Sequence, residues 1–284
     1  ALLEKEGIKH LDVNTPLIDF SFDQTALKEI KSQASAAVTL AASPVTKLSK
    51  EVRKLIGTRP VYELTVSYQK NGKTAYVFNF KKGTVTLGIP YQPAGKERTG
   101  NLFGVFIDKK GKTQLLANSS YNNGRLIFER NSLSTYGIGY KTPAPAFTDT
   151  AKDWAKDSID FVTSRDLIPG ITAKSFAPDT AVTRATFLMA LGRLSGADLS
   201  GFKTSSFTDV KNSDAAMPYI EWAVQNKIVQ GIGDSRFGPD QPISREQMAV
   251  ILVNYATAIN DKLPVSMEAI TFMDSTKIAA VARD

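Results

Sequence analysis

The chain has 284 residues, more than one domain usually holds, so we expect at least two hydrophobic cores. Hydrophobic residues make up 42% and charged residues 22%, which excludes a disordered chain, and no apolar run approaches the roughly 20 residues that span a bilayer, so we expect no membrane insertion. The sequence has no cysteine and a single histidine, His10, which excludes disulfides and most metal sites and catalytic triads. We therefore expect no metal and no cofactor, and we place His10 on the surface. Because the sequence begins at Ala1 without a signal peptide, we expect both ends to be cut from a longer protein.

The positive charge is concentrated in the first half of the chain. Residues 1–142 hold 21 Lys and Arg against 11 Asp and Glu, a net charge of +10, whereas residues 143–284 hold 14 against 17, a net charge of −3. This asymmetry favours separate domains and attraction of the front half to an anionic partner, although a solvated lysine-rich surface is the commoner explanation. We expect no nucleic acid partner.

Short runs of alternating or β-branched residues predict strands in the front half. Lys70-Asn71-Gly72-Lys73 and Lys109-Lys110-Gly111-Lys112 carry the residues that tight hairpins require, and helical spacing of apolar residues predicts short helices at Gln24–Ala34 and Leu48–Ile56. The pattern favours a β-sandwich-like spacer domain, residues 1–142, that ends before Pro143-Ala144-Pro145. The predicted strands are Leu17–Phe22, Ala37–Leu40, Val61–Tyr68, Tyr76–Phe80, Thr84–Ile89, Phe103–Ile107, Arg125–Phe128 and Thr135–Tyr140.

The second half contains an internal repeat. When the sequence is shifted by 61 residues, many apolar, glycine and motif positions coincide without a gap from Ser158 to Leu194. We expect a first copy at 143–204, a second at 205–265 and the start of a third at 266–284, which opens with Phe272-Met273-Asp274. The coinciding pairs include Ile159 and Ile220, Gly170 and Gly231, Phe176 and Phe237, Pro178-Asp179 and Pro239-Asp240, Arg184 and Arg245, and Leu191 and Leu252.

Each complete copy is predicted to fold as a helix, a turn and a second helix. The first helices are expected at Trp154–Ile168 and Tyr219–Val229, each ended by a glycine in the left-handed conformation, Gly170 or Gly231. The second helices start after Thr183 and Ser244, which act as N-caps. In the second copy Ser244 and Gln247 form a capping box; in the first copy Thr186 takes the position of Gln247. The predicted fold class is thus multidomain α and β: an N-terminal β-sandwich-like domain with short helices, followed by a C-terminal all-α region of helical repeats.

The motifs Phe-Thr-Asp, Gly-Ile, Phe-x-Pro-Asp and Thr-Arg-Ala or Ser-Arg-Glu, in this order, resemble the S-layer homology family. The resemblance covers residues 147 to about 258 in two complete copies and a truncated third. The front domain also resembles the β-rich modules that precede such repeats in bacterial surface proteins, through Arg59-Pro60-Val61-Tyr62 and Ser134-Thr135-Tyr136. The resemblance implies three copies packed in a pseudo-threefold bundle and an extracellular location, in the cell wall or the surface layer.

The function implied is non-enzymatic anchoring of an exported protein to pyruvylated secondary cell-wall polysaccharide, with surface-layer subunits as further partners. Family binding residues map onto the helix caps and the glycine turns. The alternative is a structural surface-layer or lectin-like assembly module, in which the basic N-terminal domain makes the main contact. The candidate ligand-binding residues are Thr183, Arg184 and Gly170 in the first copy, Ser244, Arg245 and Gly231 in the second, and in addition Asp149, Asp209, Trp154 and Trp222.

Physical chemistry supports a site at the two helix starts. A helix N-terminus offers unpaired amide groups and a positive dipole end, and an arginine after the cap adds a two-pronged donor for a carboxylate such as that of a pyruvyl ketal. Each candidate also has a purely structural explanation: the tryptophans as core residues, the glycines as turn residues, and Asp149 and Asp209 as helix caps. On the ligand hypothesis, Arg184→Ala and Arg245→Ala weaken binding and leave the melting temperature nearly unchanged.

We expect no enzymatic activity. The carboxylates of the front domain include Asp19, Asp23, Glu63 and Glu129, but no local motif selects a pair of them for glycosidase chemistry. Self-cleavage before Ser134 is not expected either, because Ser132 stands where a histidine base would be needed.

Overall fold

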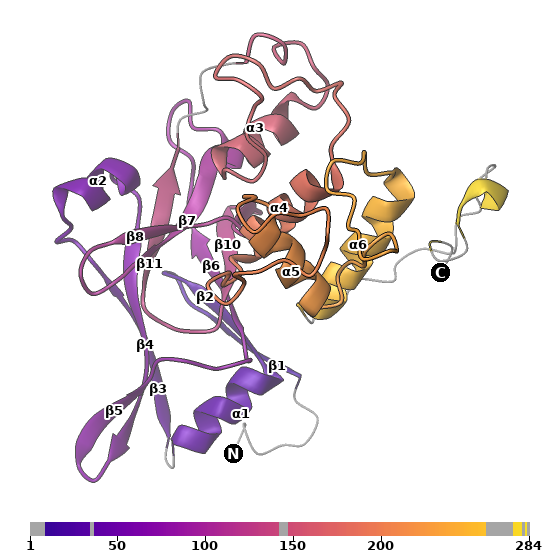
Figure 1. Cartoon of the computed structure of the whole chain (residues 1–284). Coiled ribbons are helices and arrows are strands. Elements are labelled where there is room, and N and C mark those ends of the chain that lie inside the picture. Colours follow the sequence, from indigo (N-terminus) through magenta and orange to yellow (C-terminus); the bar gives the residue numbers. More distant parts are fainter. Residues whose placement is uncertain (1–8, 35–36, 142–146, 260–274, 280–281, 283–284) are drawn as a thin grey trace. The chain divides into compact units, whose positions relative to one another are not determined.

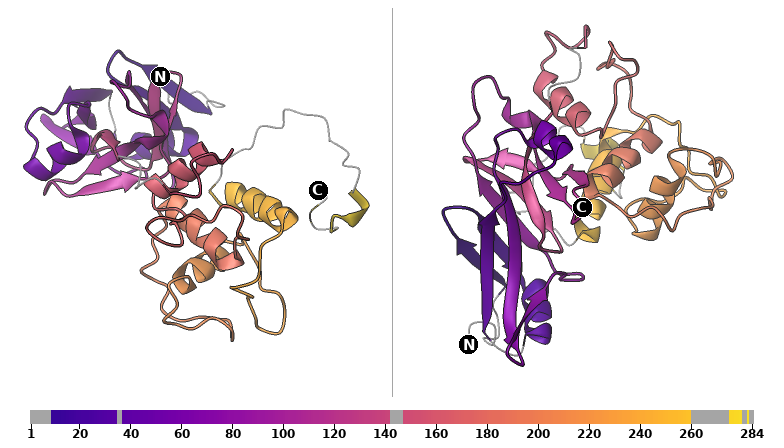
Figure 2. Two further views of the ribbon diagram at one scale, coloured as in Figure 1. Left: turned by 90° about the horizontal axis from the view of Figure 1, so that it is seen from above. Right: turned by 90° about the vertical axis from the view of Figure 1, so that its left-hand side faces the viewer.

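The computed structural model describes residues 9–34, 37–141, 147–259, 275–279 and 282. By packing, the chain divides into two compact units, Ala1–Arg165 and Asp166–Asp284. Figure 1 and Figure 2 show the strands of the first unit in indigo to magenta and the later helices in orange to yellow. The proline boundary at 143–145 and the third-copy opening at 272–274 lie outside the described residues, so the predicted domain boundaries stay predictions.

The first unit contains two antiparallel sheets. They share one hydrophobic core, to which Phe20 and Leu87 contribute from one sheet and Leu64 and Tyr136 from the other. The five-stranded sheet has the order β1 (His10–Asn14), β2 (Asp19–Asp23), β6 (Val85–Pro90), β10 (Arg125–Arg130), β9 (Ser120–Asn122). The six-stranded sheet has the order β3 (Val38–Pro44), β4 (Val61–Lys70), β11 (Thr135–Tyr140), β7 (Leu102–Ile107), β8 (Thr113–Leu116), with β5 (Lys73–Val77) paired to β4.

Two short helices pack against the sheets at the positions that the sequence predicts. The first, α1 (Gln24–Gln33), buries Leu27 and Ile30 in the shared core, and the Asp23 carboxylate caps it by accepting from the backbone N–H of Ala26 at 2.6 Å. The second, α2 (Lys50–Ile56), packs on the outer face of the six-stranded sheet and forms a second, smaller cluster. That cluster contains Val52, Ile56, Val61, Phe103, Val105 and Ile107.

The predicted hairpins are confirmed. Asn71 and Gly72 take left-handed φ values of 51° and 72° between β4 and β5, and Gly111 has φ 78° between β7 and β8, conformations that asparagine and glycine accept at low cost. The sequence pattern missed β1, β8 and β9. These strands have three to five residues and lie at or beside sheet edges, so they lack the buried alternation that marks a strand in a sequence. His10 is exposed on β1, as expected.

The helix α3 (Lys156–Ser164), which begins the first repeat copy, belongs to the first unit. The residue after it, Arg165, is 7% exposed and donates to the backbone carbonyls of Gly100, Leu102 and Ser119 at 2.5, 2.7 and 3.0 Å. Its guanidinium also stacks on the ring of Phe161, 3.8 Å from the centroid. Burial lowers the pKa of Arg165 to about 10, which still leaves it charged at neutral pH. One arginine thus fastens α3 to the strands around it.

The second unit contains α4 (Arg184–Ser195), α5 (Met217–Gln225), α6 (Arg245–Ala258) and a short 3-10 helix, η3 (Ser275–Lys277). Its core gathers one apolar stripe from each α-helix together with residues of the loops. Within the described residues, no helix is long and apolar enough to cross a membrane. The buried core residues include Leu188, Leu191, Met217, Ile220, Ala223, Ile228, Phe237 and Ile251.

The predicted all-α C-terminal repeat region is wrong. In the described part of the chain the protein is β-rich, with two antiparallel sheets and six α-helices, and the repeat helices of 9 to 14 residues are joined by long structured loops. Two isolated β-bridges, Thr183 with Pro242 and Gly233 with Arg236, tie these loops together. The physical reason lies in the motifs, since Phe-x-Pro-Asp and the glycine turns contain residue types that end helices.

The helix ends also differ from the prediction. The first helices stop at Ser164 and Gln225, and the residues that turn left-handed are Asp166 (φ 55°) and Lys227 (φ 58°) rather than glycines. Gly231 has no left-handed φ; a Cβ atom there would lie 2.7 Å from the Arg236 carbonyl oxygen and 2.7 Å from the Phe207 ring. This glycine is therefore needed for close packing and not for its backbone freedom.

We expect Arg165→Ala to lower the free energy of unfolding of the first unit by roughly 2 to 4 kcal/mol, because two buried carbonyls and one partly buried carbonyl lose a charged donor. Urea denaturation followed by near-UV circular dichroism measures the change. Arg53→Ala, at an exposed position of α2, serves as the matched control and should change stability little. Equal effects of the two substitutions would show that the carbonyl bonds contribute nothing.

Candidate functional site

The start of α4 is the first place where the sequence predicts an anion site. Thr183 caps the helix, its hydroxyl oxygen accepting from the backbone N–H of Thr186 at 3.1 Å and pairing with the Thr186 hydroxyl at 2.9 Å. The two preceding amides also have partners. The backbone N–H of Arg184 donates to the Gln241 carbonyl and that of Ala185 to the Pro239 carbonyl, both at 3.0 Å. The loop of the second copy thus already occupies the amide groups that a free helix start would offer to an anion.

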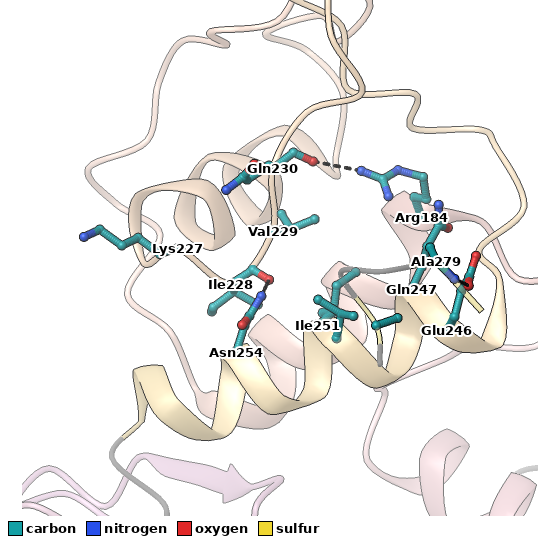
Figure 3. A pocket seen from close by; sticks show the side chains of 12 residues that line it. Arg184, Lys227, Ile228, Val229, Gln230, Glu246, Gln247, Ile251, Asn254 and Ala279 are labelled. Atoms are coloured by element: carbon teal, nitrogen blue, oxygen red, sulfur yellow. Dashed lines mark hydrogen bonds between the residues drawn. The ribbon is translucent and has the colours of Figure 1, made fainter. Parts of the chain in front are cut away.

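The Arg184 side chain is buried, with 5% of the residue exposed. Its Nε donates to the Phe237 carbonyl at 3.2 Å and its Nη2 to the Gln230 carbonyl at 3.0 Å, and its guanidinium lies 4.7 Å from the centre of the Phe237 ring. Figure 3 shows the bond to Gln230 at the rim of a groove. Burial lowers the pKa of Arg184. The arginine of the first copy is therefore a cross-link to the loop of the second.

Asp209, another predicted site residue, holds the same loop. Its carboxylate oxygens accept from the backbone N–H groups of Phe237 and Gly238, both at 2.8 Å. Burial alone would raise the pKa of Asp209, but the two amide donors outweigh it and the pKa is lowered. Arg184 and Asp209 thus converge on Phe237, one through its carbonyl and ring and the other through its amide.

Between α4, the end of α5 and α6 lies a groove of about 310 Å³. Its lining is apolar at Ile228, Val229 and Ile251, which are at most 7% exposed. Asn254 crosses from α6 and donates to the Ile228 carbonyl at 3.2 Å. The polar lining residues are Arg184, Lys227, Gln230, Glu246, Gln247 and Asn254.

The groove is polarised along α6. In Figure 3, Lys227 and Asn254 lie toward one end, whereas Arg184 and Glu246 lie toward the other. Glu246 and Asn254 are eight residues apart on one helix, about 12 Å. At the far end the Glu246 carboxylate accepts from the backbone N–H of Ala279 at 3.0 Å. Lys227 is exposed, so its ammonium is the cation that a ligand can approach most readily.

The start of α6 carries the confirmed capping box of Ser244 and Gln247. Here Arg245 is exposed, in contrast to the buried Arg184 sixty-one residues earlier. The two helices differ in exposure further along as well: Leu191 of α4 is 5% exposed, whereas its counterpart Leu252 of α6 is 46% exposed. The face of α4 that packs against α5 therefore corresponds to an open face of α6, and the two arginines have different environments.

The remaining predicted residues do not gather at the groove. Asp149 and Trp154 belong to the unit Ala1–Arg165; both are exposed, Trp154 at 96%, and Trp154 precedes α3 instead of lying within it. Trp222 is partly buried against the core, with its ring 6.4 Å from that of Tyr255. Gly170 and Gly231 lie in loops outside the groove lining.

Sequence reasoning missed most of the groove. Lys227, Gln230 and Asn254 have different residues at the matching positions of the first copy, namely Asp166, Pro169 and Arg193. A search for recurring residues therefore passes over them. Within the described residues, no group of three or more His, Asp or Glu side chains is arranged to hold a metal ion.

Comparisons with known proteins identify the repeat. The model of the S-layer homology domain matches residues 146–188 and 206–249. These matches support the S-layer homology family for both copies. The front sheets lie outside them.

The similar proteins are named as enzymes or as surface proteins. An amylopullulanase of Thermoanaerobacterium thermosulfurigenes is 31% identical over 57% of this chain, and an endoglucanase of Bacillus sp. (strain KSM-635) is 33% identical over 51%. The surface-layer 125 kDa protein of Lysinibacillus sphaericus is 28% identical over 48%. The matches cover 8%, 15% and 12% of these relatives. The chain is thus similar to a small part of each.

The buried position of Arg184 changes the stability expectation for the two arginines. We expect Arg184→Ala to lower the free energy of unfolding by roughly 2 to 4 kcal/mol, since the buried Phe237 carbonyl and the partly buried Gln230 carbonyl lose their charged donor, and Arg245→Ala to change it by less than about 0.5 kcal/mol. Urea unfolding of the two variants side by side tests this. Equal losses would mean that Arg245 is as buried in solution as Arg184.

The lowered pKa of Asp209 predicts that the stability of the fold depends on pH. Because its folded-state pKa lies below the unfolded value of about 3.9, its contribution to stability is present above that pH and is lost as the pH falls through the folded pKa. Asp209→Asn keeps one acceptor oxygen and loses the charge, so we expect lower stability at pH 7 and a smaller difference from the wild type below about pH 3. Thermal melts between pH 2.5 and 7 measure this; a constant difference over that range would contradict it.

Proposed function

We propose that this chain is a non-enzymatic module that anchors an exported protein to the bacterial cell wall by binding pyruvylated secondary cell-wall polysaccharide. The observation that carries the proposal is the groove built from both copies, with an apolar floor, amide side chains and an exposed lysine. The S-layer homology matches support cell-wall anchoring and a cell-surface or extracellular location. So does the similarity to the surface-layer 125 kDa protein and to a relative named as a cell wall amidase of Bacillus anthracis.

Each part of the groove suits a part of a saccharide. Val229, Ile251 and the partly exposed Val250 offer a floor for the C–H face of a sugar ring, and a mostly apolar lining with a few placed polar groups is typical of small-ligand sites. Gln230, Gln247 and Asn254 carry amides that both donate and accept, as sugar hydroxyls require.

The ketal carboxylate is proposed to lie at the Lys227 end. Glu246 would repel it at the opposite end, where the Arg184 guanidinium already gives two of its donor groups to carbonyls. The role first predicted for Arg184 thereby passes in part to Lys227, while Thr183, Arg184 and Asp209 hold the loop that forms the wall. In this assignment the anion is bound by the Lys227 side chain and not by the N-terminus of α4.

The exposed start of α6 extends the proposal. Ser244 and Arg245 present the same cap that Thr183 and Arg184 present in the first copy, without a partner loop among the described residues over Arg245. We propose that a third copy, of which the sequence shows the opening Phe272-Met273-Asp274, packs there and gives Arg245 the environment of Arg184.

A pull-down with purified wall polysaccharide tests the ligand. We expect the chain to bind the native polymer and to lose most binding after chemical removal of the pyruvyl groups. Lys227→Gln should weaken binding to the native polymer by about tenfold and have little effect on the stripped polymer, since one ion pair of this kind contributes about 1 to 2 kcal/mol.

Lys227→Arg should retain binding, and Lys211→Gln, at another exposed lysine of the same unit, is the matched control. Binding that is unchanged by pyruvate removal would refute the carboxylate mechanism. An equal loss of binding in the Lys211 and Lys227 variants would show that binding depends on the overall charge and not on a site at Lys227.

A further inference from the structure

The outer face of the six-stranded sheet changes character along its length. Where α2 covers it, the outward residues are apolar, among them Phe103 and Val105. On β3 and β4, outside this helix-covered cluster, these outward positions carry small side chains, three of the four polar, in cross-strand register: Thr39 lies opposite Ser67, and Ala41 opposite Thr65. Such a face is suited to water.

Tyr76 and Phe78 break this pattern. Tyr76 stands opposite Ser67 on the neighbouring strand and therefore points to the same outer face, whereas Val77 between the two aromatics is fully buried. Tyr76 is 46% and Phe78 49% exposed, and their rings lie 5.4 Å apart with planes only 24° from parallel. The Lys109 ammonium, from the turn between β7 and β8, lies 5.4 Å from the centre of the Phe78 ring. We name Tyr76, Phe78 and Lys109 the aromatic platform.

The surroundings of the platform are basic. Residues 70–82 contain Lys70, Lys73, Lys81 and Lys82 and no Asp or Glu. Lys81 is paired with Glu29 at 3.0 Å. The turn at 109–112 adds three lysines, and its acidic neighbour Asp108 is engaged in the turn, accepting from the backbone N–H groups of Lys110 and Lys112 at 2.8 Å. The chain before and after the two aromatic residues, and the turn that carries Lys109, are thus rich in lysine.

We propose that the aromatic platform binds an anionic polysaccharide chain. Aromatic faces attract the C–H groups of pyranose rings, the serine and threonine hydroxyls beside them can bond sugar hydroxyls, and lysine ammonium groups pair with carboxylate or phosphate substituents. A protein partner would be expected to meet a more apolar surface, since the centres of protein interfaces are depleted in charged and small polar residues. The site goes beyond the anchoring groove, because it shares no residue with it and lies in the other unit.

Binding of the full chain to polygalacturonate tests the inference, with methyl-esterified polygalacturonate as the neutral counterpart of the same backbone. We expect binding to the acidic polymer that weakens with added salt, and a loss of about tenfold or more in Tyr76→Ser/Phe78→Ser. Lys109→Gln should weaken binding to the acidic polymer and leave binding to the neutral one unchanged. Leu115→Ser, which removes another exposed apolar side chain of the same sheet, is the matched control.

The measurements are made in both the wild type and the Lys227→Gln background, so that the two sites are separated. Equal losses from the aromatic substitutions in both backgrounds support the platform; no loss in either overturns it and leaves the groove untouched. Equal binding of both polymers would overturn its selection of anions. Tyr76→Phe/Phe78→Tyr keeps both rings, so it should retain binding even if the serine variant melts early. Loss of a dimer in sedimentation, instead of loss of glycan binding, would assign the platform to a second copy and overturn the inference.

Discussion

The second unit depends on the burial of one guanidinium. Removing Arg184 from water is costly, and the cost is offset because two loop carbonyls and the Phe237 ring surround it. The carbonyls are themselves held in place: the Asp209 carboxylate accepts from two backbone N–H groups of the loop, and the N–H groups at the start of α4 donate to the loop carbonyls of Gln241 and Pro239. The groove wall is therefore set by hydrogen bonds between the copies rather than by the helical stripes alone.

A repeated sequence does not give a repeated environment. Arg184 and Arg245 occupy the same motif position, yet only the first has a partner loop in the described chain, because copy two follows copy one. Small contacts within each copy do recur: Arg193 donates to the Leu167 carbonyl, and Asn254 at the matching position donates to the Ile228 carbonyl. Local bonds are thus fixed by the repeat, whereas burial depends on the neighbouring copy.

This distinction also explains what the sequence could predict. The caps at Thr183 and Ser244, the hairpin at Asn71-Gly72 and the two short front helices were predictable, because a few adjacent residues determine each of them. The left-handed turns at Asp166 and Lys227 were not, because neither residue is a glycine, and the burial of Arg184 was not, because it follows from contacts between residues far apart in the chain. The groove lining also combines distant residues: Lys227 comes from the turn after α5 and Asn254 from α6, and the two have no motif in common.

The two proposed glycan sites, the aromatic platform and the groove, differ in how they recognise a ligand. The net charge of +10 in residues 1–142 acts on an anionic polymer up to about a Debye length away, roughly 8 to 10 Å in physiological salt, and distinguishes polymers by charge density more than by sugar identity. The groove has a lysine at one end and a glutamate at the other, so it attracts weakly at a distance and selects by fit at contact. High salt should therefore weaken the first kind of contact far more than the second, and a chain with both can concentrate at the wall before its groove engages a particular saccharide.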